Sequence, residues 1–144
     1  MKIIFLDVDG VLNSVQDRFS TKLETRKHIL FLRHIVNKAD AEIVLSSSWR
    51  ICGLLPKLCR ILREYNLRIS DITPYILDGA SRGREIRAWL DDHTGIESFV
   101  ILDDEDFDIV NMFPDNIVKT NSEVGLQKED AEKCIAILSN IKSK

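Results

Sequence analysis

The sequence predicts a doubly wound (Rossmann-like) α/β fold, in which helices cover both faces of a mostly parallel sheet. Short apolar runs that are typical of buried parallel strands occur at 2–6, 41–45 and 98–102. Stretches with the apolar spacing of helices lie between and after these runs. Polar residues follow each of the three runs at once, at the strand ends where open parallel sheets bind their ligands.

The first half of the chain alternates strand and helix. The run KIIFL at 2–6 is continuously apolar and includes β-branched and aromatic residues, so it predicts a strand that is buried on both faces. A helical stretch follows over about 21–38, and the run AEIVL at 41–45 predicts the second strand. A second helix is expected over about 54–65.

The alternation continues in the second half. The segment LRISDITPYI at 67–76 predicts a short edge strand, because Pro74 argues against a central one. A helix is expected over about 82–93, and the run NIVK around Ile117 is a weaker strand after the run SFVIL. The last helix is expected over about 128–140. Its apolar residues recur on one helix face: Ala131, Cys134, Ile135, Leu138 and Ile141.

The composition indicates one ordinary globular domain. A chain of 144 residues can bury its own core, so a single domain over 1–144 is expected. Charged residues make up 30% and the formal net charge is -3, which gives no whole-chain sign of nucleic-acid binding. The apolar run at the N-terminus is broken at Asp7, so it predicts neither a signal peptide nor a membrane span. A cytoplasmic protein without membrane partners is expected.

The cysteine pattern supports the same compartment. Cys52, Cys59 and Cys134 are odd in number and form no CxxC pair. Free thiols in a reducing compartment therefore fit better than a disulfide framework. We expect these residues to fill core or half-buried positions.

Acidic and hydroxyl side chains follow three of the predicted strands. Asp7 and Asp9 end the first strand, Ser46 begins the polar segment after the second, and Asp103 and Asp104 end the third. If the strands are parallel neighbours, these groups meet at one edge of the sheet. Several carboxylates gathered there repel one another unless a cation compensates them. Hard oxygen ligands of this kind favour Mg²⁺.

These motifs resemble the haloacid dehalogenase (HAD) superfamily of phosphotransferases. The resemblance rests on FLDVDGVLN, then IVLSSSWR, then an arginine before an amphipathic helix, and then VILDDEDFD. It extends from Lys2 to about Asp108, and in detail it is closest to small phosphatase-like domains of RNA repair, including the phosphatase half of phage polynucleotide kinase-phosphatases. It implies a HAD-like fold and a Mg²⁺-dependent phosphatase.

The resemblance also implies residue roles. Asp7 would be the nucleophile that forms an aspartyl-phosphate. Asp9 would be the general acid and base, and its backbone carbonyl would reach the metal together with Asp7. Gly10 would let the chain turn close to the substrate phosphate. Asp103 and Asp104 would complete the Mg²⁺ site.

Other polar residues would bind the substrate. A hydroxyl group after the second strand would hydrogen-bond the transferring phosphoryl group, and both Ser46 and Ser47 stand where it is expected. Arg50 could grip a substrate phosphate with its bidentate guanidinium. The family usually has a lysine near the start of a helix, whereas this chain has Arg82 and Arg84 at the start of the helix expected over about 82–93. Arg82 is favoured because it directly precedes a glycine.

Several residues have simpler interpretations. Trp49 is expected to pack rather than to act in catalysis, and Asn13 either orders the turn behind Asp9 or only caps it. From Asp104, acids recur at Asp106 and Asp108 as in a calcium-binding EF-hand loop, but Ile109 stands where that loop needs glycine, so this interpretation is rejected. The histidines have no ligand spacing and are expected on surfaces or helix faces: His28, His34 and His93.

The chain has no room for a large cap domain. The stretches 14–40 and 51–80 each hold little more than one helix, so the site is expected to be open. Basic residues after Arg50 suggest a track for a nucleic-acid backbone, although Glu64 interrupts it and a solvated helix face is the competing interpretation. The track would consist of Lys57, Arg60, Arg63 and Arg68.

Two classes of function follow. The first is a phosphomonoester hydrolase that acts on a phosphorylated substrate, either a nucleic-acid end or a small nucleotide or sugar phosphate. The second is a non-catalytic or regulatory binding domain with the same fold. The presence of both Asp7 and Asp9 favours the enzyme, because binding alone needs no acid and base. The sequence does not indicate an oligomeric state.

Overall fold

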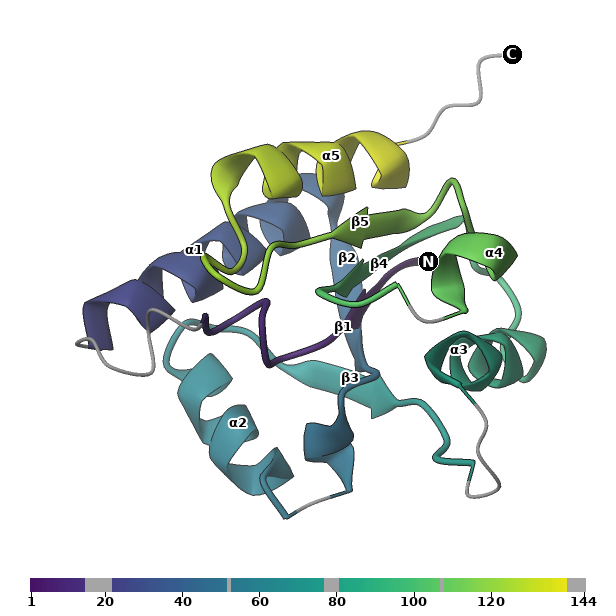
Figure 1. Cartoon of the computed structure of the whole chain (residues 1–144), viewed down its shortest axis with the longest axis horizontal. Helices are drawn as coiled ribbons and strands as arrows, with labels where there is room; N and C mark the ends of the chain where they lie inside the picture. Colours follow the sequence, from purple (N-terminus) through teal and green to yellow (C-terminus); the bar gives the residue numbers. More distant parts are fainter. Residues whose placement is uncertain (15–21, 52, 77–80, 107, 140–144) are drawn as a thin grey trace.

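The computed structural model describes residues 1–14, 22–51, 53–76, 81–106 and 108–139, and these form a parallel sheet with helices on both sides (Figure 1). All pairings between its strands are parallel, in the order β3-β2-β1-β4-β5. The strands are β1 (Lys2–Leu6), β2 (Ala41–Leu45), β3 (Ile69–Ile72), β4 (Ser98–Asp103) and β5 (Ile117–Lys119). The helices are α1 (Lys22–Ala39), the 3-10 helix η2 (Ser48–Arg50), α2 (Leu55–Arg63), α3 (Arg82–Asp91), α4 (Ile109–Met112) and α5 (Lys128–Leu138).

The sheet separates two hydrophobic cores. Successive side chains of a strand point to opposite faces, and in β1 Ile4 and Leu6 enter one core whereas Ile3 and Phe5 enter the other. Buried residues of α1, α2 and α5 close the first core, and those of α3 and α4 close the second. This burial on both faces explains why the central strands are continuously apolar, and it confirms the predicted doubly wound fold.

The predicted elements are present, with boundaries that differ by a few residues. β3 is an edge strand that ends before Pro74, as expected. η2 and α4 were not expected, because they are too short to show a helical period. Cys134 is buried and Cys59 half-buried, both as free thiols, whereas Cys52 lies outside the described residues.

His28 lies on a face of α1, which is one of the two placements expected for it, but that face is buried and not on the surface. It is 1% exposed, and its Nδ1 lies 2.9 Å from the carbonyl oxygen of Leu126. The backbone N–H of Leu126 in turn donates to the carbonyl of Val11, in the turn after β1. The histidine therefore packs inside the fold and supports the loop that holds this turn.

The described residues contain no cap domain. Between β2 and β3 they form only η2 and α2, and between β3 and β4 only α3. Among the helices described here, none combines the length and the apolar character that crossing a membrane requires.

The strand order reverses between β1 and β4. From β1 the chain moves outward through β2 to β3, and it then returns to the other side of β1 as β4 and β5. In open parallel sheets this switch point leaves a crevice at the carboxyl ends of the two strands. Asp7 directly follows β1 and Asp103 ends β4, so both lie at the switch point.

Candidate active site

The register of the sheet brings three predicted residues into one row. Leu6 pairs with Leu45 of β2 and with Leu102 of β4, so Asp7, Ser46 and Asp103 follow at equivalent positions. Hydrogen bonds continue the pairing, because the N–H of Asp7 donates to the carbonyl of Leu102 over 3.0 Å. Strand alternation places the row on the α3 side of the sheet, where Phe5 is buried.

Three of the four acidic residues that the sequence placed at this edge form a cluster. Asp7, Asp103 and Asp104 each offer an oxygen, and these atoms all lie within 4.8 Å of one another. Asp103 is fully buried and Asp7 is 7% exposed. Burial, with the neighbouring charge of Asp103, raises the pKa of Asp7 to about 8. Burial also raises the pKa of Asp103 to about 6, against the opposing effect of Arg82.

Arg82 is the cation of this cluster. Its Nη1 donates to Oδ2 of Asp103 over 2.7 Å and lies 3.4 Å from Oδ1 of Asp7. Arg84 lies on the same helix but is exposed, and the structure shows no contact between it and the carboxylates. Of the two candidates, the helix therefore brings Arg82 to the site.

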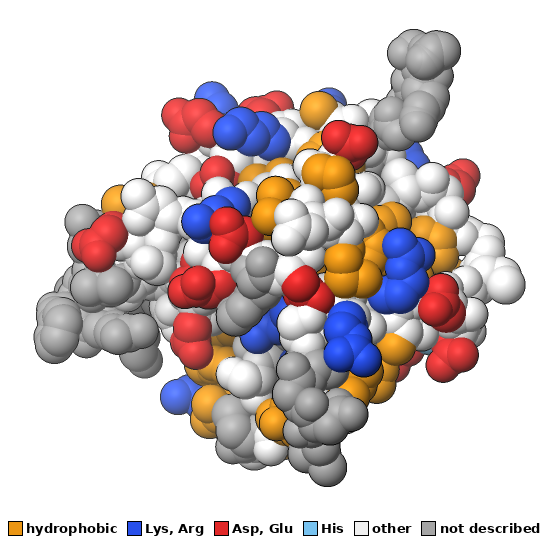
Figure 2. Space-filling view, turned by 45° about the vertical axis from the view of Figure 1, so that its right-hand side comes forward, with side chains coloured by type: hydrophobic (Ala, Val, Ile, Leu, Met, Phe, Trp, Pro, Cys, Tyr) orange, Lys and Arg blue, Asp and Glu red, His pale blue; other side chains and the backbone are white. Residues whose placement is uncertain are grey.

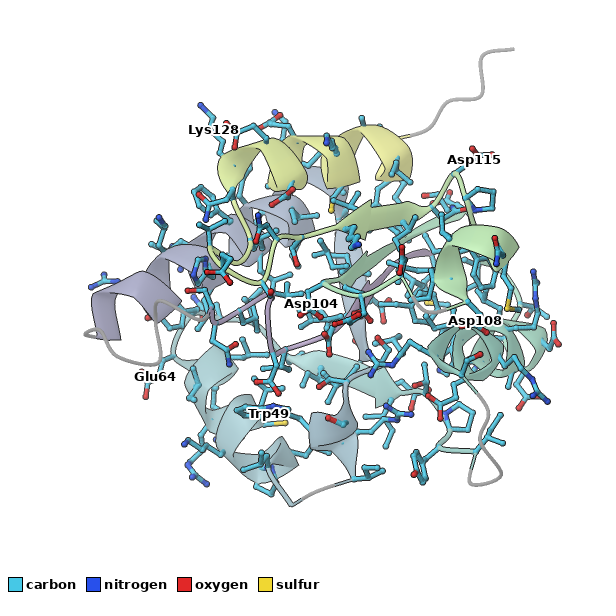
Figure 3. The ribbon with its side chains drawn as sticks, viewed as in Figure 1. Trp49, Glu64, Asp104, Asp108, Asp115 and Lys128 are labelled. Carbon is cyan, nitrogen blue, oxygen red and sulfur yellow. The ribbon has the colours of Figure 1, made fainter. Side chains whose placement is uncertain are left out.

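The position of Arg82 depends on the start of α3. Asp108, from the loop after β4, accepts hydrogen bonds from the hydroxyl of Ser81 and from the N–H of Gly83, the latter over 2.7 Å. A Cβ at Gly83 would lie 2.7 Å from Asp108 Oδ1, so this approach requires glycine. Asp108, which Figure 3 labels beside α3, thus satisfies the N–H of Gly83 in the first turn of the helix and holds the turn that carries Arg82.

Gly10 makes the turn after β1 compatible with the cluster. Its φ is +83°, and a Cβ there would lie 2.2 Å from Oδ2 of Asp104. The hydroxyl of Thr120 donates to its carbonyl over 2.8 Å and ties the turn to the segment after β5. Glycine is needed both for the left-handed backbone and for the space that Asp104 occupies.

Asp9 lies outside the carboxylate cluster and has its own partners. Nδ2 of Asn13 donates to Oδ1 over 3.0 Å, and the indole Nε1 of Trp49 donates to Oδ2 over 3.1 Å. Oδ1 of Asn13 also accepts a hydrogen bond from the N–H of Gly10. Asn13 therefore orders the turn behind Asp9, which is one of the two roles expected for it. The interpretation of Trp49 as packing alone is incomplete, because its ring both packs on the core and binds Asp9.

The two serines have different surroundings. Oγ of Ser47 accepts a hydrogen bond from the N–H of Trp49 over 3.1 Å and caps η2. Oγ of Ser46 is buried and has no hydrogen-bond partner. Among the buried side-chain nitrogen and oxygen atoms of the described residues, it is the one in this state. It stands in the row beside Asp7, so an unsatisfied hydroxyl is available there for a ligand.

Arg50 is placed differently from the expectation that it grips a substrate. Its side chain is buried and pairs with Glu85 of α3, with Nη2 and Oε1 2.6 Å apart. The remaining N–H groups donate to backbone carbonyls, which occupies the guanidinium completely. These contacts hold the loops after β2 and β3 against α3 instead of reaching toward a ligand. The carbonyls belong to Ser46, Ser47, Thr73 and Pro74.

Sequence reasoning missed the supporting residues of the site. Asp108 lies in the acidic run DDEDFD, and its position there does not indicate that it binds the start of a helix 25 residues earlier. Glu85 and Thr120 carried no local signal, because their partners Arg50 and Gly10 lie far away in the sequence. The raised pKa values of Asp7 and Asp103 mark this edge of the sheet as a candidate active site, since such shifts gather at active sites.

Comparison with known proteins places this site in a family. Residues 3–131 match the family model described as the HAD domain in Swiss Army Knife RNA repair proteins. Apart from Lys2 of β1, the match includes the five strands, and it includes every residue of the site described above. No curated protein and no solved structure matches the chain significantly.

Proposed function

The chain belongs to the HAD domains of Swiss Army Knife RNA repair proteins, and from this premise we propose that it is a Mg²⁺-dependent phosphomonoester hydrolase. The observation that carries the proposal is the row of Asp7, Ser46 and Asp103, with the guanidinium of Arg82 in contact with both aspartates. It combines a nucleophile, a free hydroxyl donor, a metal-type carboxylate and a cation at the switch point of the sheet.

The first half of the reaction transfers the phosphoryl group to the protein. A carboxylate oxygen of Asp7 attacks phosphorus, and the bond between phosphorus and the ester oxygen breaks. Asp9 gives its proton to the departing oxygen, so an alcohol leaves and an aspartyl-phosphate remains on Asp7. Arg82 and the hydroxyl of Ser46 donate to the phosphoryl oxygens and stabilise their charge.

The second half regenerates the protein. Asp9, now a carboxylate, takes a proton from a water molecule whose oxygen attacks phosphorus. The bond between phosphorus and Asp7 breaks, inorganic phosphate leaves, and both aspartates return to their starting states. The attack is at phosphorus in both halves, so the same phosphate contacts serve twice.

The carboxylates fit a divalent cation. Asp7, Asp103 and Asp104 offer oxygen ligands within 4.8 Å of one another, and burial of the first two leaves negative charge that Arg82 alone does not balance. The backbone carbonyl of Asp9 is the further ligand that we propose. When bound, Mg²⁺ supplies positive charge that neutralises these carboxylates and the substrate phosphate.

We propose a nucleic-acid end as the substrate. The family description refers to RNA repair, and the described residues form no cap that would shield the site from a polymer. Lys57, Arg60 and Arg63 are exposed on α2, and the structure gives them no ion-pair partner among the described residues. Phosphates next to the terminal one would contact this helix.

The basic residues that could contact a nucleic-acid backbone near the site are those on α2. Arg68 precedes β3 and therefore lies at the amino edge of the sheet, opposite the catalytic edge. Arg50 is buried in its pair with Glu85, so it does not extend the track toward the site. Figure 2 shows acidic and basic side chains interleaved on the face it presents, so that face carries no broad basic field.

The test compares substrates at two salt concentrations. An oligonucleotide with a 3′-terminal phosphate should be hydrolysed with a higher kcat/KM than the matching mononucleotide, and added salt should reduce the difference. The double variant Lys57→Glu/Arg60→Glu should lose the preference and keep its activity on an aryl phosphate. The control Lys38→Glu/Lys133→Glu makes the same charge change on α1 and α5 and should retain the preference.

Two results would redirect the proposal. Equal or higher kcat/KM for mononucleotides or sugar phosphates at both salt concentrations would indicate a small-molecule phosphatase. An absence of Mg²⁺-dependent turnover with every phosphomonoester would indicate a binding or regulatory domain.

A further inference from the structure

Asp9 is an exposed residue whose carboxylate is nevertheless held at both oxygens. Asn13 donates to Oδ1 over 3.0 Å and Trp49 donates to Oδ2 over 3.1 Å. An exposed aspartate otherwise changes rotamer freely and exchanges its hydrogen bonds with water. The two donors come from different strand ends, so together they restrict both the position and the plane of the carboxylate.

The indole donor is itself fixed by the fold. Trp49 lies in the middle of η2, and its backbone N–H donates to Oγ of Ser47. The carbonyl of Ser47 accepts a 2.8 Å hydrogen bond from the buried guanidinium of Arg50. The ring packs against the core that α2 closes, and Figure 3 shows it between Asp104 and α2. The position of the indole is therefore set by its surroundings and not by Asp9.

Neither partner of Asp9 can exchange its catalytic proton. An indole N–H and a side-chain amide N–H donate hydrogen bonds but accept none at nitrogen. Both groups therefore orient the carboxylate, and neither can take up the proton that Asp9 transfers. We propose that Trp49 is a positioning residue for the acid–base Asp9, and that it aims the carboxyl group at the leaving oxygen. This inference rests on the proposed function.

Such a role has a kinetic signature. Protonation by Asp9 matters when the leaving group is a basic alkoxide, as from a sugar, and matters little when a stable nitrophenolate leaves. The quantity kcat/KM includes only the steps up to departure of the leaving group, so it excludes the later hydrolysis of the aspartyl-phosphate. Loss of the indole donor should therefore lower kcat/KM for an alkyl phosphate more than for an aryl phosphate.

The chain contains its own matched control. It has two tryptophans, and the second, Trp89, donates its indole N–H to Oδ2 of Asp71 over 2.9 Å. Trp89 is buried on α3 against Phe5, and neither Trp89 nor Asp71 belongs to the site. Trp89→Phe removes the same kind of hydrogen bond and reduces a ring in the same way as Trp49→Phe.

The experiment measures kcat/KM of the full chain with Mg²⁺ on benzyl phosphate and on 4-nitrophenyl phosphate. Trp49→Phe should lower the benzyl-to-nitrophenyl ratio about tenfold, a fraction of the full effect of general acid catalysis. Trp89→Phe should leave the ratio unchanged. Both substrates are measured on the same sample, so the fraction of folded protein cancels even if a variant is less stable.

The outcomes separate the inference from the function it rests on. An unchanged ratio in Trp49→Phe, or an equal fall in Trp89→Phe, would overturn the positioning role while the wild-type activity stands. A wild-type protein that hydrolyses neither substrate with Mg²⁺ would overturn the proposed function, and the role of Trp49 with it.

Discussion

Asp7 and Asp103 end neighbouring parallel strands at equivalent positions, and a single nitrogen of Arg82 lies 3.4 Å from one carboxylate and 2.7 Å from the other. Two buried carboxylates thus share one cation, with Asp104 close by. Burial is the main reason that their pKa values rise, and the charge of neighbouring carboxylates adds to it. The negative charge that Arg82 leaves unbalanced makes the site responsive both to protons and to divalent cations.

Without metal, stability should fall as the pH rises through the range in which these groups ionise. The pKa of Asp7 rises from 3.8 to about 8 and that of Asp103 to about 6, so between about pH 4 and pH 8 the folded protein binds more protons than the unfolded chain. The free energy of unfolding therefore decreases with pH across this window, by on the order of a few kcal/mol. Urea unfolding in chelator at about pH 5 and pH 8 measures it.

The variant Asp7→Asn should flatten this pH dependence, because the amide cannot ionise. It should also be more stable than the wild type in chelator at about pH 8. If the variant kept the full slope between the two pH values, the ionisation of Asp7 would not be its cause.

Added Mg²⁺ should raise the melting temperature of the wild-type protein, because a ligand that binds only the folded state stabilises it. Asp103→Ala should show little or no such shift, since it removes a ligand of the cluster. Ca²⁺ should also raise the melting temperature but support little turnover, because its looser geometry misplaces the nucleophile. Full activity in excess chelator would contradict the metal requirement.

Gly10→Ala should reduce Mg²⁺ binding and turnover by displacing Asp104, whose Oδ2 would lie 2.2 Å from the new Cβ. Gly95→Ala is the matched control, because its φ of +77° is also positive but nothing lies within 4 Å of a Cβ there. Both variants should lose about 1 kcal/mol of stability from backbone strain. Equal activity of the two variants would show that the contact with Asp104 has no role in the site.

Glu85→Gln should destabilise the protein strongly, because it leaves the charge of Arg50 buried without its partner. The loss expected for breaking a buried ion pair is about 3–5 kcal/mol. The exposed pair of Lys119 and Asp106, 3.7 Å apart, provides the comparison, and Lys119→Met should cost about 1 kcal/mol or less. Denaturant unfolding measures both, and similar losses would argue against a structural role for the buried pair.

The sequence predicted the parts of this site that follow from strand ends. An apolar run that stops at an acid fixes both a buried strand and the carboxylate at its carboxyl edge, so Asp7 and Asp103 could be placed before their contacts were known. The fold class and the family resemblance are confirmed for the same reason. Ser46 and Ser47 could not be separated, because only the register shows which of them lies in the row with Asp7.

Contacts between distant segments could not be predicted. Arg50 resembles a phosphate ligand in the sequence, and only the fold shows that Glu85 and nearby carbonyls occupy its guanidinium. Trp49 looks like a packing residue because an indole is mostly apolar, and its single N–H finds Asp9 only through the geometry of η2. Such residues depend on three-dimensional neighbours that leave no spacing or periodicity in the chain.

The nucleophile provides the most direct test. The measurement is kcat for 4-nitrophenyl phosphate with Mg²⁺, on wild-type protein and on Asp7→Asn, with the melting temperature as a check on folding. We expect turnover by the wild type and none above background by the variant, because an amide of the same shape cannot attack phosphorus effectively. A folded Asp7→Asn protein that retains near-normal kcat would contradict the account.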